Sequence, residues 1–343
     1  MSAKAYAQAG VHLDVAREIL ARIAPAVRST YRPEVIAGLG AFAGLLEARH
    51  LQAMEAPVLV ATTDGVGTKV LVAARLRRWD TLGYDLVHHC VNDLLVHGAE
   101  PLFMLDYIGG ERLDPDVVTA VVAGVAAACR SVGCVLLGGE TAEMPGVYRP
   151  GALEVVGTMV GIVERQGVLD GRSIRPGDRI LALPSSGLHT NGYSLARKAL
   201  NDLDWEAIVP DLGTSIGEAL LAPHRCYVEP IRRLRAAGVP IKGLAHITGG
   251  GVFENLPRIL PEGTAAVLRR GTWPEPPIFA LIQERAGVDP EEMFHVFNMG
   301  LGMLIVVPPE AVAVALAALP GELYAVGEVA TGAREVRIEG MRQ

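Results

Sequence analysis

The sequence has 343 residues, half of them hydrophobic and only 5% aromatic, with 39 Gly, 22 Pro and a net charge of −7. A chain of this length exceeds what one hydrophobic core usually serves, and its aliphatic, glycine-rich composition is typical of α/β proteins, so two α/β domains are expected. Basic residues form no long run, which argues against the electrostatic footprint of a nucleic-acid partner.

The sequence gives no indication of export or membrane insertion. Residues 1–10 lack a basic stretch followed by an apolar one, and the longest apolar stretch, residues 117–129, is too short to span a bilayer. The four cysteines, at positions 90, 129, 134 and 226, have neither the pairing of a zinc site nor the density of a disulfide framework. We therefore expect a cytoplasmic protein with reduced cysteines and no membrane partner.

The first half alternates strands and helices. Apolar spacing predicts a helix over 11–27, and a glycine-rich connector over 32–45 has the composition of a mobile loop. Further along, the pattern predicts strands over 57–63, 102–108, 134–137 and 153–163, and helices over 68–78, 84–97 and 115–131. We assign these elements to a first domain over residues 1–168.

The second half repeats the alternation after a cluster of turn residues. This cluster lies between residues 164 and 176, and Pro176-Gly177-Asp178 follows it directly. The pattern then predicts strands over 179–183 and 241–247, and helices after 191, near 218–237 and after 251. The second domain is therefore expected over residues 169–343.

The segment Asp64-Gly-Val-Gly-Thr-Lys69 follows a predicted strand and opens a predicted helix. Backbone N–H groups and the helix dipole are available to an anion at such a junction, so the layout fits a phosphate-binding loop. Its spacing matches neither the Walker A motif nor the dinucleotide fingerprint. A tight strand-to-helix turn without a ligand remains the alternative.

Carboxylates at three separate elements suggest a metal bound by oxygen. Asp93 lies in a mostly apolar helical stretch beside Asn92, and Glu140 follows a predicted strand in a turn flanked by glycines. Together with Asp64, they supply the hard ligands that a nucleotide-bound Mg²⁺ requires. Zinc bound by His89 and Asp93 is disfavoured because no third ligand is evident nearby. A helix-surface aspartate and an ordinary polar loop are the alternatives.

Two segments of the second half combine glycines with polar side chains between a strand and a helix. In the first, residues 185–194, Ser185 and Asn191 can cap backbone amides, and His189 can transfer a proton or bind a phosphate oxygen. The second, residues 246–254, carries a triple glycine that offers a further anion-binding loop. For His189, a solvated loop histidine is the alternative.

Six segments occur in order along the chain. They are Thr63-Asp-Gly-Val-Gly-Thr-Lys69, Cys90-Val-Asn-Asp93, Gly98-Ala-Glu-Pro-Leu-Phe103, Gly138-Gly-Glu-Thr-Ala-Glu-Met-Pro-Gly146, Ser185-Ser-Gly-Leu-His-Thr-Asn-Gly-Tyr-Ser-Leu195 and His246-Ile-Thr-Gly-Gly-Gly251. Together they resemble the phosphoribosylformylglycinamidine cyclo-ligases, the AIR synthase family, over almost the whole chain. The resemblance implies a two-domain α/β (α+β) fold. In it, the N-terminal sheet forms a dimeric barrel with a second subunit, the C-terminal domain is an α/β sandwich, and ATP binds near the subunit interface of a homodimer.

The resemblance also carries over site residues. It implies a Mg²⁺ site at Asp64, Asp93 and Glu140 and catalytic roles for His189, Lys69 and Asp93. It implies ATP binding by Asp64, Gly65, Gly67, Thr68, Lys69, Asn92, Gly139, Glu140 and Thr141. For substrate and phosphate it implies Ser185, His189, Asn191, Thr248, Gly249, Gly250 and Gly251. Residues 22–30 contain no lysine, unlike some family members, so no catalytic lysine is assigned there.

The implied reaction converts formylglycinamidine ribonucleotide and ATP into 5-aminoimidazole ribonucleotide, ADP and phosphate, in purine biosynthesis. Phosphorylating the formyl amide oxygen would turn a poor leaving group into a good one before the amidine nitrogen attacks. Two alternatives remain because fold does not fix function. One is a small-molecule kinase of the same superfamily, and the other is a nucleotide-binding dimer without catalytic activity.

Overall fold

The computed structural model describes residues 12–341, so residues 1–10, considered above for a signal peptide, lie outside the described part. The chain divides into two compact units. Unit 1 comprises Met1–Leu94 and Ala99–Gly167, and unit 2 comprises Leu95–Gly98 and Val168–Gln343. Both contain sheets and helices, as expected for an α/β protein, and each is described by itself.

Unit 1 is built on a four-stranded sheet with the strand order β3-β6-β4-β5. Its strands are β3 (Pro57–Gly65), β4 (Glu100–Gly110), β5 (Val135–Glu143) and β6 (Leu153–Glu164). β6 is antiparallel to both of its neighbours, whereas β4 and β5 run parallel. The carboxyl ends of β3, β4 and β5 therefore lie at the same end of the sheet.

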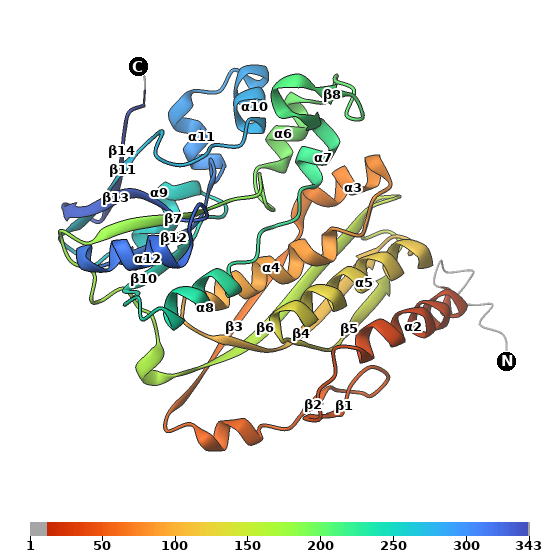
Figure 1. Ribbon diagram of the computed structural model, residues 1–343. Coiled ribbons are helices and arrows are strands. Elements are labelled where there is room, and N and C mark those ends of the chain that lie inside the picture. The colour runs from red at the N-terminus through yellow and green to blue at the C-terminus, as the bar shows by residue number, and fades with distance from the viewer. Residues whose placement is uncertain (1–11, 342–343) are drawn as a thin grey trace. The chain divides into compact units, whose positions relative to one another are not determined.

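Helices cover only one face of this sheet. They are α2 (Leu13–Arg28), α3 (Val70–Leu76), α4 (Leu82–Leu95) and α5 (Pro115–Val132), and Figure 1 shows α4 and α5 lying across the strands. Within β4, Met104 and Ile108 are fully buried, whereas Leu105 between them is 38% exposed. On β3, Leu59 is 62% exposed. The second face of the sheet therefore presents apolar side chains, Leu59 and Leu105 among them, that the described residues of unit 1 leave exposed.

Helix α5 confirms the helix predicted over 115–131 and extends it by one residue, beyond the apolar stretch 117–129. It has 18 residues and is long and apolar enough to cross a bilayer by length and composition. Asp114 caps its start by accepting a hydrogen bond from the Asp116 N–H, and Gly133 ends it with a left-handed φ of 74°. Nine of its residues are buried, and it packs against α2, β4 and β5, which is the behaviour of a core helix.

Two segments expected to be loops contain strand residues. The segment 134–137 was predicted as a short strand followed by a turn that contained Glu140, but β5 continues to Glu143. Gly139 pairs with Asp106 and Glu140 pairs with Tyr107 of β4, so pairing with a long neighbouring strand overrides the local turn preference of the glycines. The connector 32–45 contains two short strands, β1 (Val35–Ala37) and β2 (Leu45–Leu46), which pair with each other.

Unit 2 is built on a six-stranded mixed sheet with the strand order β10-β12-β7-β13-β11-β14. Its strands are β7 (Arg179–Pro184), β10 (Gly243–His246), β11 (Thr264–Arg269), β12 (Leu301–Val307), β13 (Tyr324–Thr331) and β14 (Glu335–Glu339), and a separate pair consists of β8 (Ile208–Val209) and β9 (Thr214–Ser215). Its helices are α6 (Tyr193–Ala199), α7 (Ile216–Leu221), α8 (Val228–Ala236), α9 (Gly251–Asn255), α10 (Ile278–Ala286), α11 (Pro290–Val296) and α12 (Val312–Ala318). Every residue of β12 is buried, so this strand lies at the centre of the core of unit 2.

The crossing of α4 and α5 generates the first prediction. A Cβ on Gly83 of α4 would lie 2.6 Å from the Val121 carbonyl oxygen and closer still to the backbone of Gly124 and Val125 on α5. Helix propensity alone favours alanine over glycine, but the two backbones leave no room for a methyl group. We expect Gly83→Ala to lower the melting temperature by about 2–8 °C, measured by calorimetry.

Gly167→Ala is the matched control, because its new methyl group would meet nothing closer than 3.4 Å. Equal melting temperatures for Gly83→Ala and the control would contradict close packing of the two helices.

Candidate functional site

The loop after β3 is a tight strand-to-helix turn. The Gly65 N–H donates to Asp64 Oδ1 at 2.7 Å, and the Val66 N–H donates to the Val155 carbonyl at 3.0 Å. A one-turn 3₁₀ helix, Gly67–Lys69, follows and leads into α3. Gly67 adopts a left-handed φ of 61°, which only glycine adopts at little cost. Gly67 therefore sets the direction in which Thr68 and Lys69 leave the sheet.

Two of the expected metal ligands lie next to the same histidine. His89 Nε2 lies 2.9 Å from Asp64 Oδ2 and 3.8 Å from Asp93 Oδ2. Burial alone would favour the neutral ring, but the hydrogen bond to Asp64 and the charges of both carboxylates raise the pKa of His89. Asp64 and Asp93 thus form an acidic pair beside the same imidazole nitrogen of His89. The sequence analysis considered His89 only as a zinc ligand beside Asp93 and did not anticipate its bond to Asp64.

Lys69 has a structural partner inside unit 1. Its Nζ lies 2.7 Å from Asp85 Oδ1 on α4, and both side chains are 0% exposed. Burial lowers the pKa of Lys69, against the attraction of Asp85. In this structure Lys69 therefore anchors the loop to α4 through its ion pair with Asp85. Asn92, on the same helix, is also fully buried.

Glu140 lies far from the acidic pair. The strand register shows the separation: Asp64 of β3 pairs with Gly157 of β6, and Gly157 also pairs with Asp106 of β4. Asp106 in turn pairs with Gly139 of β5, the residue before Glu140. Three strand spacings separate β3 from β5, a distance of about 14 Å. Within one chain, Glu140 therefore does not share a metal ion with Asp64 and Asp93, contrary to the three-carboxylate site expected from the sequence. Thr141 follows Glu140 on the same strand.

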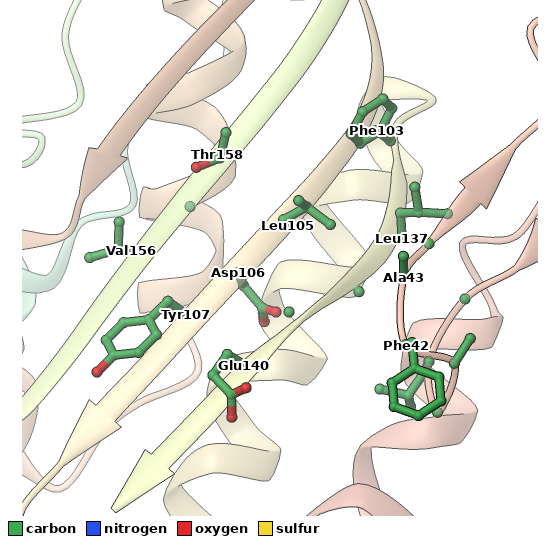
Figure 2. A pocket seen from close by; sticks show the side chains of 18 residues that line it. Phe42, Ala43, Phe103, Leu105, Asp106, Tyr107, Leu137, Glu140, Val156 and Thr158 are labelled. Atoms are coloured by element: carbon green, nitrogen blue, oxygen red, sulfur yellow. The ribbon is translucent and has the colours of Figure 1, made fainter. Parts of the chain in front are cut away.

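A pocket of about 690 Å³ lies beside Glu140. Figure 2 shows it between the glycine-rich segment 38–44, with Phe42 and Ala43, and the strands that carry Asp106, Tyr107 and Glu140. Leu105 and Leu137 contribute apolar walls, and the volume is in the range of small-molecule sites. The connector expected to be a mobile loop thus lines a cavity, and Gly139 and Glu140 line it from the sheet.

Two glycine-containing loops lie side by side in unit 2. A Cβ on Gly249 would lie 3.1 Å from Asn191 Oδ1. Asn255 Nδ2 donates to the carbonyls of Gly249 and Gly251, at 3.1 and 2.8 Å, and so fixes the path of the triple glycine. Left-handed φ values of 85° and 59° at Gly250 and Gly251 require glycine there.

Polar side chains hold both loops in place. Thr248 Oγ1 donates to Asn255 Oδ1 at 3.3 Å, and Ser185 Oγ donates to Asn298 Oδ1 at 2.8 Å. Asn298 Nδ2 in turn donates to the Gly187 carbonyl at 2.9 Å. The residues predicted as the substrate and phosphate site, namely Ser185, His189, Asn191, Thr248, Gly249, Gly250 and Gly251, thus lie on two fixed loops of unit 2.

His189 belongs to a cluster of three buried histidines and is not a solvated loop residue. It is 1% exposed, has a left-handed φ of 61°, and accepts a hydrogen bond from the Ser186 N–H at Nε2. Its ring stacks on that of His224 at a centroid distance of 3.9 Å, and His224 Nε2 lies 2.9 Å from His246 Nε2. No motif marked His224, because it reaches the cluster only through the fold.

Comparisons with known proteins agree with the two-unit organisation. Residues 47–163 match the family described as AIR synthase related protein, N-terminal domain, and residues 175–339 match its C-terminal domain. The chain is 49% identical over 336 residues to the phosphoribosylformylglycinamidine cyclo-ligase of Thermosynechococcus vestitus, covering 96% of this chain and 98% of that protein.

Solved structures share the fold at much lower identity. The thiamine-monophosphate kinase of Stenotrophomonas maltophilia is 20% identical, with a TM-score of 0.66 and coverage of 95% and 97%. The hydrogenase maturation protein HypE in complex with ATP is 21% identical, with a TM-score of 0.66 and coverage of 91% and 88%. These likenesses show the fold alone. The family match over both halves and the near-full-length identity establish that the chain belongs to the phosphoribosylformylglycinamidine cyclo-ligase family of AIR synthase related proteins.

Proposed function

We propose that this chain catalyses the ATP-dependent cyclisation of formylglycinamidine ribonucleotide to 5-aminoimidazole ribonucleotide in purine biosynthesis, with release of ADP and phosphate. The observation that carries the proposal is 49% identity over 96% of the chain to a phosphoribosylformylglycinamidine cyclo-ligase. The similarity to a thiamine-monophosphate kinase, at 20% identity, supports the fold but not a kinase function.

The chemistry requires that an amide oxygen be made a leaving group. Transfer of the γ-phosphoryl group of ATP to the formyl oxygen gives an O-phosphorylated imidate and ADP. Attack of the amidine nitrogen on that carbon then closes the five-membered ring and expels phosphate, which carries the former formyl oxygen. Such a transfer depends mainly on positioning and on charge neutralisation by the protein.

Asp64 and Asp93 fit a magnesium ion. Their side chains are 40% and 29% exposed, and both carboxylates lie near His89 Nε2, at 2.9 and 3.8 Å. Mg²⁺ is commonly bound by one or two carboxylates together with water and substrate phosphates. When bound, it would neutralise charge on the transferred phosphoryl group. Glu140, about 14 Å away across the sheet, is left out of this metal site.

The pocket beside Glu140 is suited to the nucleoside part of ATP. It has apolar walls, a volume of about 690 Å³, and polar groups at Asp106, Tyr107 and Glu140. Because β3 and β5 end at the same end of the sheet, an extended nucleotide bound in the pocket can direct its phosphates toward the Asp64 loop. ATP bound to HypE, a protein of the same fold, supports nucleotide use.

In unit 2, His189 is proposed to act on the phosphoryl acceptor, formylglycinamidine ribonucleotide. Backbone amides of the fixed loop 248–250 are proposed to bind the substrate phosphate, whereas the Gly251 N–H donates to the Thr248 carbonyl at 3.0 Å. His189, stacked on His224, can orient the amide or balance charge on the departing phosphate. Lys69, by contrast, is proposed to position the phosphate loop through Asp85.

We also propose a cytoplasmic homodimer. The open face of the unit 1 sheet carries Leu59 and Leu105, which are 62% and 38% exposed, and a second copy could cover them. A barrel formed by two such sheets is the arrangement that the family resemblance implies.

The central test of the function is turnover of formylglycinamidine ribonucleotide, first unlabelled and then labelled with ¹⁸O. Protein incubated with formylglycinamidine ribonucleotide, ATP and Mg²⁺ should yield 5-aminoimidazole ribonucleotide, identified by mass. With ¹⁸O in the formyl group, the label should appear in inorganic phosphate, because that oxygen accepts the phosphoryl group. Unlabelled phosphate from an active enzyme would exclude the imidate, and absence of product from folded protein would refute the function.

Substitution of the acidic pair tests the metal assignment. Asp64→Asn or Asp93→Asn should lower kcat by about a hundredfold or more while the melting temperature changes little, since a ligand is lost and not core packing. Asp116→Asn, at an exposed position on α5, is the control. A normal rate with an unchanged Mg²⁺ dependence would remove that residue from the metal site.

Substitution of His189 tests its proposed role at the phosphoryl acceptor. His189→Ala should leave ATP affinity nearly intact and lower the maximal rate by about a hundredfold or more, as expected for a lost electrostatic or proton-transfer contact. His295→Ala, at an exposed histidine of unit 2, is the matched control. Full activity of His189→Ala would limit His189 to a packing role.

The dimer is tested by sedimentation. At micromolar concentration the wild-type protein should sediment with about twice the chain mass of 36.3 kDa. Leu59→Glu should shift the protein toward monomer, because a charge on the open sheet face opposes burial there. Val314→Glu, at a position 48% exposed in unit 2, should leave the dimer intact. A wild-type monomer with full activity would refute the dimer.

A further inference from the structure

Asp106 occupies an unusual position in unit 1. It lies on β4 between the buried residues Met104 and Ile108, on the sheet face that the helices cover. It borders the 690 Å³ pocket and also a small cavity of about 30 Å³, which Ile23 of α2 and Val122 of α5 help to line. Asp106 is therefore located where the pocket meets the layer between sheet and helices.

Gly139 makes this position possible. It pairs with Asp106 across the β4–β5 ladder, and a Cβ on Gly139 would fall inside the Asp106 carboxyl group. The absence of a side chain opens a gap in β5, and through this gap the carboxyl reaches the pocket, as Figure 2 shows with Asp106 and Glu140 side by side. The family resemblance implied nucleotide binding by Gly139, and neither it nor the residue pattern singled out Asp106.

The surroundings of the carboxyl group are apolar. Asp106 is half-buried: its carboxyl group borders the pocket, and protein atoms surround it on the other sides. Of the described elements packed against it, α2 presents Leu20, Ile23 and Val27, and β6 presents Gly157. The titratable neighbours are Glu140 on β5 and Cys129 on α5, whose thiol pKa is raised by its hydrogen bond to Cys134 and by burial. Among these neighbours no cation compensates the Asp106 charge.

This setting favours the neutral acid. Burial raises the pKa of Asp106 to about 7, opposed only by a hydrogen bond from its own backbone N–H. Within residues 12–341, that N–H is its only hydrogen-bonding partner. A buried carboxyl group with so few partners, at the wall of a pocket, calls for an explanation, and a ligand supplies one.

A neutral carboxyl group has a hydrogen-bond donor, its O–H, next to a hydrogen-bond acceptor, its C=O. On its Hoogsteen edge adenine presents the complement, the N7 acceptor next to the amino donor, whereas guanine presents two acceptors, N7 and O6, on the same edge. The apolar walls of the pocket, which include Phe103, Leu105 and Leu137, suit the faces of a flat base. The chemistry of the pocket therefore matches adenine better than guanine.

We propose that the Asp106 carboxyl group recognises the base of the nucleotide, donating to a ring nitrogen of adenine and accepting from its amino group. This proposal rests on the proposed function only in taking a purine nucleotide as the ligand. Asp106 is then the residue that selects ATP over GTP. Gly139 is required because it leaves the carboxyl group accessible to the pocket.

The test compares ATP with GTP across pH. Dissociation constants of the Mg²⁺ complexes are measured by calorimetry on the full-length protein between about pH 6 and pH 9, which spans the raised pKa. In the wild type, the preference for ATP over GTP should fall by up to about tenfold per pH unit above pH 7, because loss of one proton removes the donor. Both nucleotides carry the same phosphates, so phosphate titration cancels in the ratio.

Two substitutions sharpen the test. Asp106→Asn keeps one donor and one acceptor in nearly the same shape, so its ATP preference should match the low-pH wild type and stay constant with pH. Asp106→Leu should reduce the ATP-to-GTP preference by about tenfold or more. Asp116→Asn, which lies outside the residues lining the pocket, should retain the wild-type pH profile.

The outcomes separate this proposal from the proposed function. A wild-type preference that does not change with pH, or an Asp106→Leu protein that still discriminates as the wild type does, overturns base recognition even if cyclisation is normal. A pH-linked preference for ATP in a protein that forms no aminoimidazole ribonucleotide refutes the function and supports base recognition. If Asp106→Leu fails to fold, the pH dependence of the ATP-to-GTP preference, compared between the wild type and Asp106→Asn, still tests base recognition.

Discussion

The hydrogen-bonded ladder of β6 with β3 and β4 is the constraint on which the arrangement of unit 1 depends. β6 (Leu153–Glu164) pairs along almost its whole length with both neighbours, and β5 joins the outer side of β4. One row of this sheet contains Asp64, Gly157, Asp106 and Gly139 in that order. The register therefore fixes which polar groups are neighbours and which are strands apart.

The same ladder explains why one end of the sheet can serve a long ligand. The acidic pair lies at the β3 side, and the pocket lies at the β5 side, about 14 Å away. A compact ligand would meet only one of these groups, whereas an extended nucleotide can meet both. The helices on one face bury His89, Lys69 and Asp85, and the other face carries exposed apolar side chains such as Leu59 and borders the pocket through Leu105. Unit 1 thus keeps its charged contacts on the helix side and its exposed apolar surface on the other.

In unit 2 the polar side chains of the candidate site are positioned by loops and not by the register of paired strands. Asn255 and Asn298 fix the two glycine-containing loops through their carbonyl groups. The three histidines come from the loop after β7, the loop before α8 and the end of β10. Their packing makes the position of the His189 ring depend on two other rings.

The sequence by itself determined the α/β class, most helices and strands, and the loop from Asp64 to Lys69, because these depend on local periodicity, on glycine and on motif spacing. The order of motifs was also sufficient to indicate the family. Only the tertiary structure decided the partners of individual side chains. Glu140 is separated from Asp64 by the strand order, and Lys69 is buried against Asp85. Asp106 reaches the pocket through the gap at Gly139, and His224 joins His189 although 35 residues separate them along the chain. These relations arise from pairing and packing between distant segments, which leave no local pattern in the sequence.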